Sequence, residues 1–203
     1  MTSLDGRQSI LARLAAVPAT AQPSMPAAPG DIVSAADGDA AALVQRFVQA
    51  LDRAGATWEI AESPVVARLT LATHLQEQGV KRILSWAAGE LPVGGVLEAL
   101  DVLGIEIITP NLPVPDTRLR PQDLEIRRRY LLSIEGITVG LTGADAAFAA
   151  TGTLVLHGGP GRPLLVSQLP RRHTILLAAS RLYPSLDRWL AQLPRPAGRP
   201  IFP

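Results

Sequence analysis

The chain has 203 residues, of which 47% are hydrophobic, with a formal net charge of +1 and no cysteine. This length is enough to bury a core, and the near-neutral charge gives no general attraction to nucleic acid or to a membrane surface. The lack of cysteine excludes disulfides, thiolate nucleophiles and cysteine-ligated zinc or iron–sulfur clusters within this sequence.

The N-terminal stretch is predicted to be an arm outside the core. Residues 3–16 carry apolar side chains at helical spacing, and PATAQPSMPAAPG after them is a proline-rich stretch typical of an extended linker. Charged residues interrupt the apolar run that a secretory signal needs, and nowhere do about 18 apolar residues follow one another, so we expect a cytoplasmic protein. We divide the sequence into an arm over 1–30 and one α/β domain over 31–203.

From residue 37 the pattern alternates between helical and strand-like stretches. Helices are predicted over 37–55, 63–79, 94–104 and 122–136, and strands over 57–62, 81–87, 105–109 and 137–143. Ser63 and Pro64 are typical helix-start residues, and Gly55 is a typical stop. Such alternation is the pattern of parallel βαβ units, so we expect a mostly parallel or mixed sheet flanked by helices.

The last third has a different pattern. TLVL, PLLV and HTILL are three β-rich stretches within 153–180 that no predicted helix separates, which indicates an antiparallel or mixed extension of the sheet. Residues 183–193 are predicted to close the domain as a helix.

Residues 142–153, TGADAAFAATGT, surround a run of alanines with two Thr-Gly pairs. Thr142 and Asp145 have the spacing of a capping box, which predicts a helix that runs through the alanines and stops near Gly152. A helix start after a parallel strand is where doubly wound proteins gather ligands. Because Asp145 already complements the helix dipole, an alcohol, an amine or a water-mediated contact suits this corner better than a phosphate. A capped helix with no ligand explains the same residues equally well.

The HGGPGR stretch, residues 157–162, is rich in glycine and ends in Arg162. Such a turn can gather backbone amides and a guanidinium around an anion, although a hairpin loop is the simpler interpretation. It matches neither the phosphate-loop pattern nor the dinucleotide-binding glycine pattern, so no nucleotide-binding motif is present.

Ser167 and His173 lie six residues apart in SQLPRRH. The serine lacks the flanking glycines of a nucleophile elbow, which argues against covalent serine catalysis. We expect the two residues on neighbouring backbone segments at one end of the sheet, where they offer polar groups to a ligand. His74 and His157 do not combine with His173 in any metal-binding spacing, so no metal site is predicted. The arginine triplet 127–129 spreads around its helix and is expected to be solvated.

Together, TGADAAFAATGTLVL, GPGRPLLVSQLPRRHTILL and RLYPSL resemble the C-terminal signature of the lactate-utilisation protein C family, known as the LUD domain. The resemblance is dense over 137–190, looser over 37–136, and does not cover the arm. The family's pattern reads roughly Gly-x-Thr-Gly-Ala-Asp-x-Ala-x-Ala-Glu-Thr-Gly-Thr, and Ala150 stands where the family commonly has glutamate. The residues that match are Gly140, Thr142, Gly143, Ala144, Asp145, Ala147, Ala149, Thr151, Gly152 and Thr153, followed by Ser167, Leu169, Pro170 and His173.

The resemblance implies a fold similar to that of sugar-phosphate isomerases, CoA transferases and formyltetrahydrofolate cyclo-ligases. It also implies a role in oxidising lactate to pyruvate beside two companions, one of them an iron–sulfur protein. The sequence shows no motif for a cofactor of its own, so we expect iron–sulfur clusters in partner subunits and an accessory role for this chain. Whether the chain is catalytic by itself is left open. The alternatives are a stand-alone enzyme on a small acyl, sugar-phosphate or folate-like substrate, and a regulatory module that binds an organic acid.

We therefore expect a small organic acid or a related molecule as the ligand and iron–sulfur subunits as partners, with no nucleic-acid or membrane partner. A homo-oligomer is compatible with the sequence. The candidate catalytic residues are Asp145 and His173, and the candidate ligand-binding residues are Thr142, Gly143, Asp145, Thr151, Gly152, Thr153, Arg162, Ser167 and His173. The Asp145 corner, the glycine loop before Arg162 and the segment bearing His173 are expected to converge on one cavity.

Overall fold

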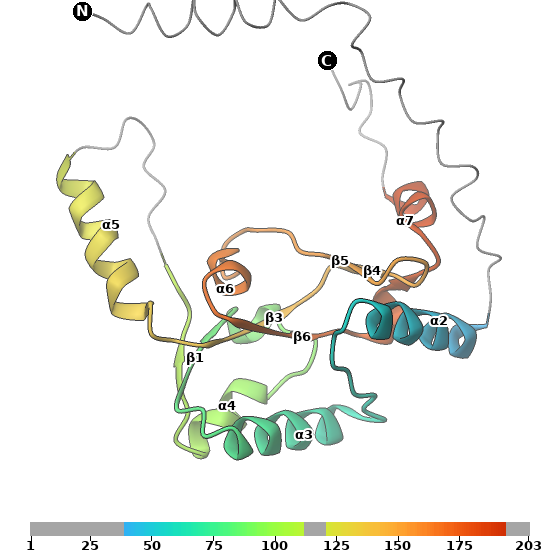
Figure 1. Cartoon of the computed structure of the whole chain (residues 1–203), viewed down its shortest axis with the longest axis horizontal. Helices are drawn as coiled ribbons and strands as arrows, with labels where there is room; N and C mark the ends of the chain where they lie inside the picture. The colour runs from blue at the N-terminus through green and yellow to red at the C-terminus, as the bar shows by residue number, and fades with distance from the viewer. Residues whose placement is uncertain (1–38, 112–120, 194–203) are drawn as a thin grey trace, which may run out of the picture. The chain divides into compact units, whose positions relative to one another are not determined.

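The computed structural model of the protein describes residues 39–111 and 121–193 (Figure 1). The α-helices are α2 (Ala40–Arg53), α3 (Pro64–Glu77), α4 (Val96–Val102), α5 (Pro121–Ile134), α6 (Leu165–Gln168) and α7 (Leu186–Gln192), with 3-10 turns η2 (Ala88–Glu90) and η3 (Ala179–Arg181). The strands are β1 (Arg82–Ser85), β2 (Glu106–Ile108), β3 (Val139–Gly143), β4 (Ala146–Phe148), β5 (Thr153–Val155), β6 (Arg172–Leu176) and β7 (Leu182–Tyr183). The predicted helix over 3–16, the linker after it and nearly all of the proline-rich loop before α5 lie outside the described residues.

Local sequence signals account for the two helices before the first strand. The Ser63 hydroxyl accepts a hydrogen bond from the Val66 N–H at 3.2 Å, and Pro64 occupies the first turn of α3. Such a cap satisfies a backbone donor that a helix start otherwise leaves free. α2 buries Phe47 on its apolar face, and the chain turns away at Gly55, whose φ is +71°. Both predicted helices are confirmed, as are those that became α4, α5 and α7.

A four-stranded sheet in the order β2-β1-β3-β6 forms the centre of the described part of the chain, and all its pairings are parallel. α3 and α4 lie on one side of this sheet and α6 on the other (Figure 1). Because both faces are covered, the large side chains of the central strands are buried: Ile83, Leu84, Val139 and Leu141 are at most 1% exposed. The predicted α/β architecture with a parallel sheet is confirmed.

Gly140 allows α6 to pack directly on β3. A Cβ at this position would clash with the backbone oxygen of Val166 and would lie 3.1 Å from Pro170 Cγ. The φ of Gly140 is not positive, so the requirement for glycine here is one of space. This close approach places α6 and the segment after it over the sheet. His173 lies beside the same position, because it is the residue of β6 that pairs with Gly140.

The predicted alanine helix after Thr142 is wrong. Residues 146–148 form strand β4, which pairs antiparallel with β5 and parallel with β7 in a second, mixed sheet. Ala146, Ala147 and Ala149 are all fully buried, so the segment has no polar face that a helix could turn to solvent. The helix propensity of a few alanines amounts to fractions of a kcal/mol per residue, and burial between two strands outweighs it. The small side chains let Phe47 of α2 pack against this sheet.

Two further strand predictions are wrong. Residues 57–62 are extended but belong to no strand and are exposed, and the Trp58 indole N–H donates to Asp52 Oδ1 at 2.7 Å. The PLLV stretch leads into α6, because Val166 N donates to Pro163 O and begins a helical turn after the proline. Val166 is fully buried, because α6 packs directly on the sheet at Gly140. The predicted antiparallel or mixed extension of one sheet by the last third is wrong in its arrangement. TLVL forms β5 of a separate mixed sheet, and HTILL contributes most of β6, which pairs parallel with β3 in the first sheet.

Candidate functional site

Four charged side chains meet at the carboxyl edge of the parallel sheet. Glu90 ends η2 after β1, Asp145 follows β3, Arg162 ends the glycine-rich loop before α6, and Arg181 ends η3 after β6. Parallel strands place their carboxyl ends at one edge, which is where open α/β sheets bind ligands. We call Glu90, Asp145, Arg162 and Arg181 the carboxyl-edge cluster.

Asp145 is the centre of this cluster. Its Oδ1 accepts from Arg162 Nη1 at 2.7 Å and lies 3.5 Å from Arg181 Nη1, while its Oδ2 accepts from the His157 N–H at 2.8 Å. The Asp145 backbone N–H donates to Val155 O at 2.8 Å. The carboxylate therefore ties two guanidinium groups and the glycine-rich loop to the end of β3. The predicted capping role of Asp145 is therefore wrong, because strand β4 and no helix follows it.

Arg162 is held on three sides. Its Nε donates to Glu90 Oε2, its Nη1 donates to Asp145, and its Cζ lies 5.4 Å from the centroid of the Trp86 ring. The hydrogen bond that Arg162 donates to Glu90 is the largest influence that raises the pKa of Arg162. Asp145 raises it further, and burial acts in the opposite direction. Arg162 and Asp145 are only 25% and 19% exposed, so salt screens their pairing less than that of a surface pair.

Two glycines lie where the backbone segments around the cluster approach closely. Gly161 has a φ of +72°, its carbonyl accepts from the Ala87 N–H at 2.8 Å, and a Cβ there would lie 3.1 Å from Ala87 Cβ. At Gly143 a Cβ would lie 3.1 Å from Pro92 Cδ and 3.3 Å from Glu90 O. Gly143, predicted to bind ligand, thus has a packing role beside Glu90.

Thr142 and His173 form a separate pair on β3 and β6. Thr142 is fully buried, and its Oγ1 lies within hydrogen-bond distance, 2.8 Å, of His173 Nε2. Burial lowers the pKa of His173, which favours the neutral imidazole. Thr142 lies three residues before Asp145, which follows the end of β3. The structure thus brings Asp145 and Arg162 into direct contact and links His173 to the same strand, and their convergence on one cavity stays a prediction.

The remaining predicted ligand-binding residues lie elsewhere. Thr151 and Gly152 lie in the turn between β4 and β5, and Thr153 begins β5, at the opposite end of this hairpin from Asp145. The Thr151 and Thr153 hydroxyls are 2.8 Å apart, and a Cβ on Gly152 would lie 3.3 Å from Ala50 of α2.

Ser167 and Ala150 each form a hydrogen bond to a backbone carbonyl. The Ser167 hydroxyl donates to Leu164 O at the start of α6, at 2.8 Å. Ala150, the position where the family commonly has glutamate, lies in the β4–β5 turn, and its N–H donates to Pro184 O at 3.2 Å.

Comparison with known proteins identifies the family. A model of the LUD domain matches residues 31–199. The chain belongs to the LUD domain family. It is also 40% identical over 55 residues to "Lactate utilization protein C" of Exiguobacterium sp. (strain ATCC BAA-1283 / AT1b), a match that covers 27% of this chain and 24% of that protein. The chain thus spans about a quarter of the length of the curated relative it matches, and no solved structure matches it.

Two members of the cluster in this LUD domain, Glu90 and Arg181, were missed from sequence. Both carry an available signal, because each follows a strand of the parallel sheet within a few residues. Trp86, which lies under Arg162, is 1% exposed, and its indole N–H has no hydrogen-bond partner among the described residues. Buried donors are rarely left in that condition.

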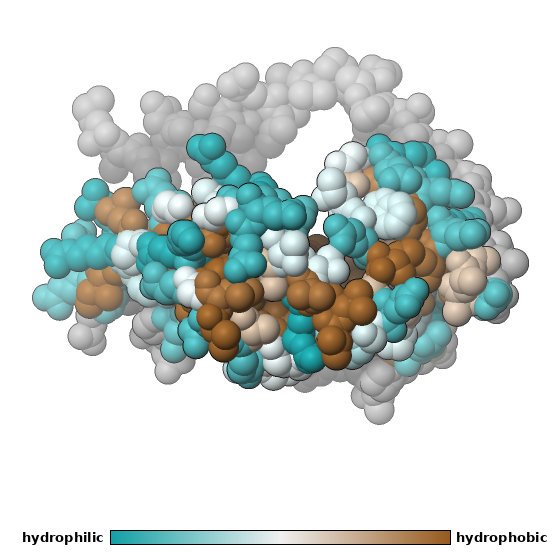
Figure 2. All heavy atoms as spheres, turned by 90° about the horizontal axis from the view of Figure 1, so that it is seen from below, coloured by the Kyte–Doolittle hydropathy of each residue, from teal (hydrophilic) through white to brown (hydrophobic). Residues whose placement is uncertain are grey.

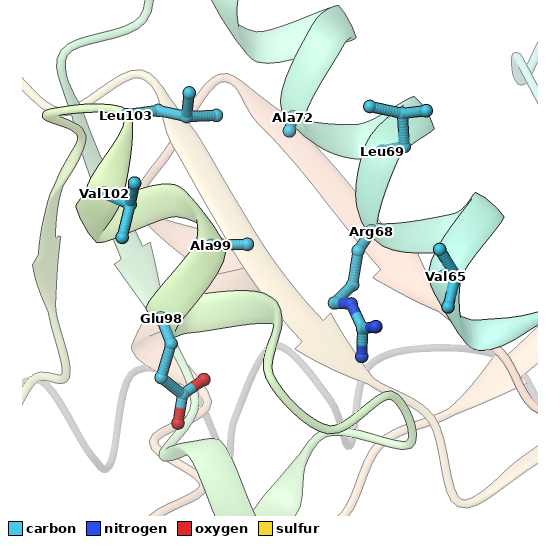
Figure 3. Close-up of a pocket in the computed structure, with 8 residues that line it drawn as sticks. All are labelled: Val65, Arg68, Leu69, Ala72, Glu98, Ala99, Val102 and Leu103. Carbon is cyan, nitrogen blue, oxygen red and sulfur yellow. The ribbon is translucent and has the colours of Figure 1, made fainter.

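An apolar groove of about 490 Å³ lies elsewhere on the LUD domain, between α3 and α4. Figure 2 views this side of the molecule and shows apolar side chains gathered around a hollow. In Figure 3, Val65 and Leu69 face the groove from α3 and Val102 from α4, with Arg68 and Glu98 at one end. The groove shares no residue with the carboxyl-edge cluster.

Two negative findings apply to the described residues of the LUD domain. Within 39–111 and 121–193, no group of three or more His, Cys, Asp or Glu side chains is arranged to hold a metal ion. In the same ranges, no helix has the length and apolar character required to span a membrane.

Proposed function

We propose that the chain is a cytoplasmic component of a lactate-utilisation system, in which L-lactate is oxidised to pyruvate together with iron–sulfur partner subunits. The observation that carries the proposal is the similarity to a relative named "Lactate utilization protein C", combined with membership of the LUD domain family. The carboxyl-edge cluster supports it, because it lies where α/β sheets bind small ligands.

An accessory role follows from electron balance. Oxidation of lactate to pyruvate removes two electrons and two protons from the substrate, and a redox group must accept the electrons. The sequence has no cysteine to ligate an iron–sulfur cluster and no glycine-rich dinucleotide motif. We therefore assign the electron-accepting groups to partner subunits and assign ligand binding or assembly to this chain.

Growth tests this role. A strain that lacks the chain should fail to grow on L-lactate as sole carbon source and should grow normally on pyruvate, because only the step before pyruvate is affected. Restoring the chain should restore growth on lactate. Equal growth of the two strains on lactate would contradict the proposal.

Affinity purification tests the division of labour. The tagged chain, recovered from lactate-grown cells, should bring with it proteins that contain iron and acid-labile sulfide. If the purified chain instead oxidises lactate alone with a soluble electron acceptor, it is a stand-alone enzyme and the accessory role is wrong.

A further inference from the structure

The two arginines of the carboxyl-edge cluster are held very differently. Arg162 donates to two carboxylates and lies over Trp86, with its side chain 25% exposed. The Arg181 side chain is 44% exposed, and its contacts are both long: Nη1 lies 3.5 Å from Asp145 Oδ1 and 3.5 Å from Ala144 O. Arg162 therefore serves to hold the segments together, and Arg181 presents a guanidinium to solvent.

The charges are balanced in number but not in position. Two carboxylates face two guanidinium groups, yet both carboxylates form their short contacts with Arg162. Asp145 Oδ1 already accepts from Arg162 at 2.7 Å, so it compensates Arg181 only across the longer distance. The Nε and Nη2 donors of Arg181 take part in neither of these contacts. Among residues 39–111 and 121–193 these two donors have no hydrogen-bond partner, and a planar guanidinium can give two parallel hydrogen bonds to a carboxylate.

The position of Arg181 suits a ligand site. It ends η3, directly after β6, and its Nη1 lies next to the chain segment that leaves β3, so two neighbouring parallel strands lead to it. η3 starts from Ala178 and the Arg181 N–H donates back to Ala178 O at 2.9 Å, so a short turn fixes the backbone that carries the side chain. A cation on a fixed backbone loses less entropy when it binds an anion.

We propose that Arg181 is the anchor for the carboxylate of a small organic acid at this edge of the sheet, with Asp145 and Arg162 positioning its guanidinium. The ligand class rests on the function proposed above, in which L-lactate and pyruvate are the relevant acids. The site itself rests on the geometry of Arg181. No residue of the α3–α4 groove is involved.

Isothermal titration calorimetry tests the site with the full chain at low ionic strength. L-lactate should bind to the wild type, and lactamide, a neutral molecule of the same shape, should not, because it lacks the charge that pairs with Arg181. Arg181→Gln should lower the affinity for L-lactate at least tenfold. Arg127→Gln, which removes an exposed arginine from α5, should bind as the wild type does.

Arg181→Lys keeps the charge but not the paired donors, so its affinity should fall between those of wild type and Arg181→Gln. Circular dichroism and urea unfolding of each variant show whether the fold is kept. Equal affinity of wild type and Arg181→Gln, equal binding of lactamide and lactate, or absence of lactate binding to the wild type would each overturn the proposal. None of these results alters the growth test above, so failure of the site and failure of the lactate role are distinguishable.

Discussion

At the scale of single residues, Asp145 connects more segments of the site than the sequence motifs indicated. Its two oxygens take three donors from the glycine-rich loop and from η3, and all three come from residues later in the chain. The capping-box pattern singled out Asp145, but the structure gives this residue contacts with the loop and η3 and no helix to cap. Thr142, its supposed partner in the cap, bonds instead to His173 across two strands.

Arg162→Lys should destabilise the fold. A lysine can keep one of the contacts with Glu90 and Asp145 but not both, and it loses the planar contact with Trp86. We expect a loss of about 1–3 kcal/mol in the free energy of unfolding, the typical cost of leaving a partly buried polar group without its partner. Urea unfolding measures it, with Arg127→Lys on α5 as the control. Identical unfolding midpoints for the two variants would show that the Arg162 contacts do not stabilise the fold.

The lowered pKa of His173 predicts that the stability of the fold depends on pH. Because burial lowers its pKa in the folded state, the unfolded state takes up a proton more readily as pH falls below the ordinary histidine value of about 6.5. This contribution to stability is complete above that pH and is lost as pH falls toward the lower, folded-state pKa. His173→Gln should therefore lose less stability than wild type between pH 7.5 and pH 5.5, measured by urea unfolding. A variant with the same pH dependence as wild type would mean that the protonation of His173 is not linked to folding.

At the scale of elements, Gly140→Ala tests the packing of α6. The added methyl group would clash with the backbone oxygen of Val166, which no side-chain rotation can relieve. Overpacking of this kind costs about 1–3 kcal/mol, and we expect the upper end of that range because backbone must move. Gly136→Ala is the matched control, since a Cβ there meets no atom within 4 Å. If thermal unfolding shows equal stability for both variants, α6 does not need the close approach.

The elements that were predicted correctly depend on local signals. The cap at Ser63, the stop at Gly55 and the apolar periodicity of the first helices act within a few residues, so the sequence displays them directly. The failures at 57–62 and 146–148 have a non-local cause. A strand exists only where a partner edge is present, and the partners of β4 are β5 and β7, which come later in the chain.

The same distinction between local and non-local causes explains which residues of the candidate site were predicted from the sequence. Asp145 and Arg162 were predicted because each belongs to a conspicuous local pattern. Glu90 and Arg181 were missed because neither belongs to a local motif. Their one sequence signal is that each follows a strand by a few residues, and the order β1-β3-β6 in the sheet brings these strand ends together. Thr151 and Thr153 were predicted to bind a ligand because they belong to the second Thr-Gly pair and match the family pattern, whereas the hairpin places them at the end opposite Asp145.

At the scale of the whole molecule, the parallel sheet provides the framework that connects the fold to the proposed role. Its two covered faces leave the carboxyl edge for polar side chains, and four charged residues from four separate segments gather there. A redox role for the chain in isolation would need an electron acceptor, which the proposal places in partner subunits. If the chain has the proposed role, the carboxyl-edge cluster is necessary for lactate utilisation and not only for stability.

Growth on L-lactate of a strain that carries Asp145→Asn tests this claim most directly. Asparagine nearly preserves the shape of the side chain but removes the charge that faces both arginines, so we expect a folded protein that no longer supports growth on lactate. Asp101→Asn, an exposed change on α4, is the control and should support normal growth. If Asp145→Asn loses about 1 kcal/mol of stability yet supports growth on lactate as wild type does, the cluster is structural and the central claim is wrong.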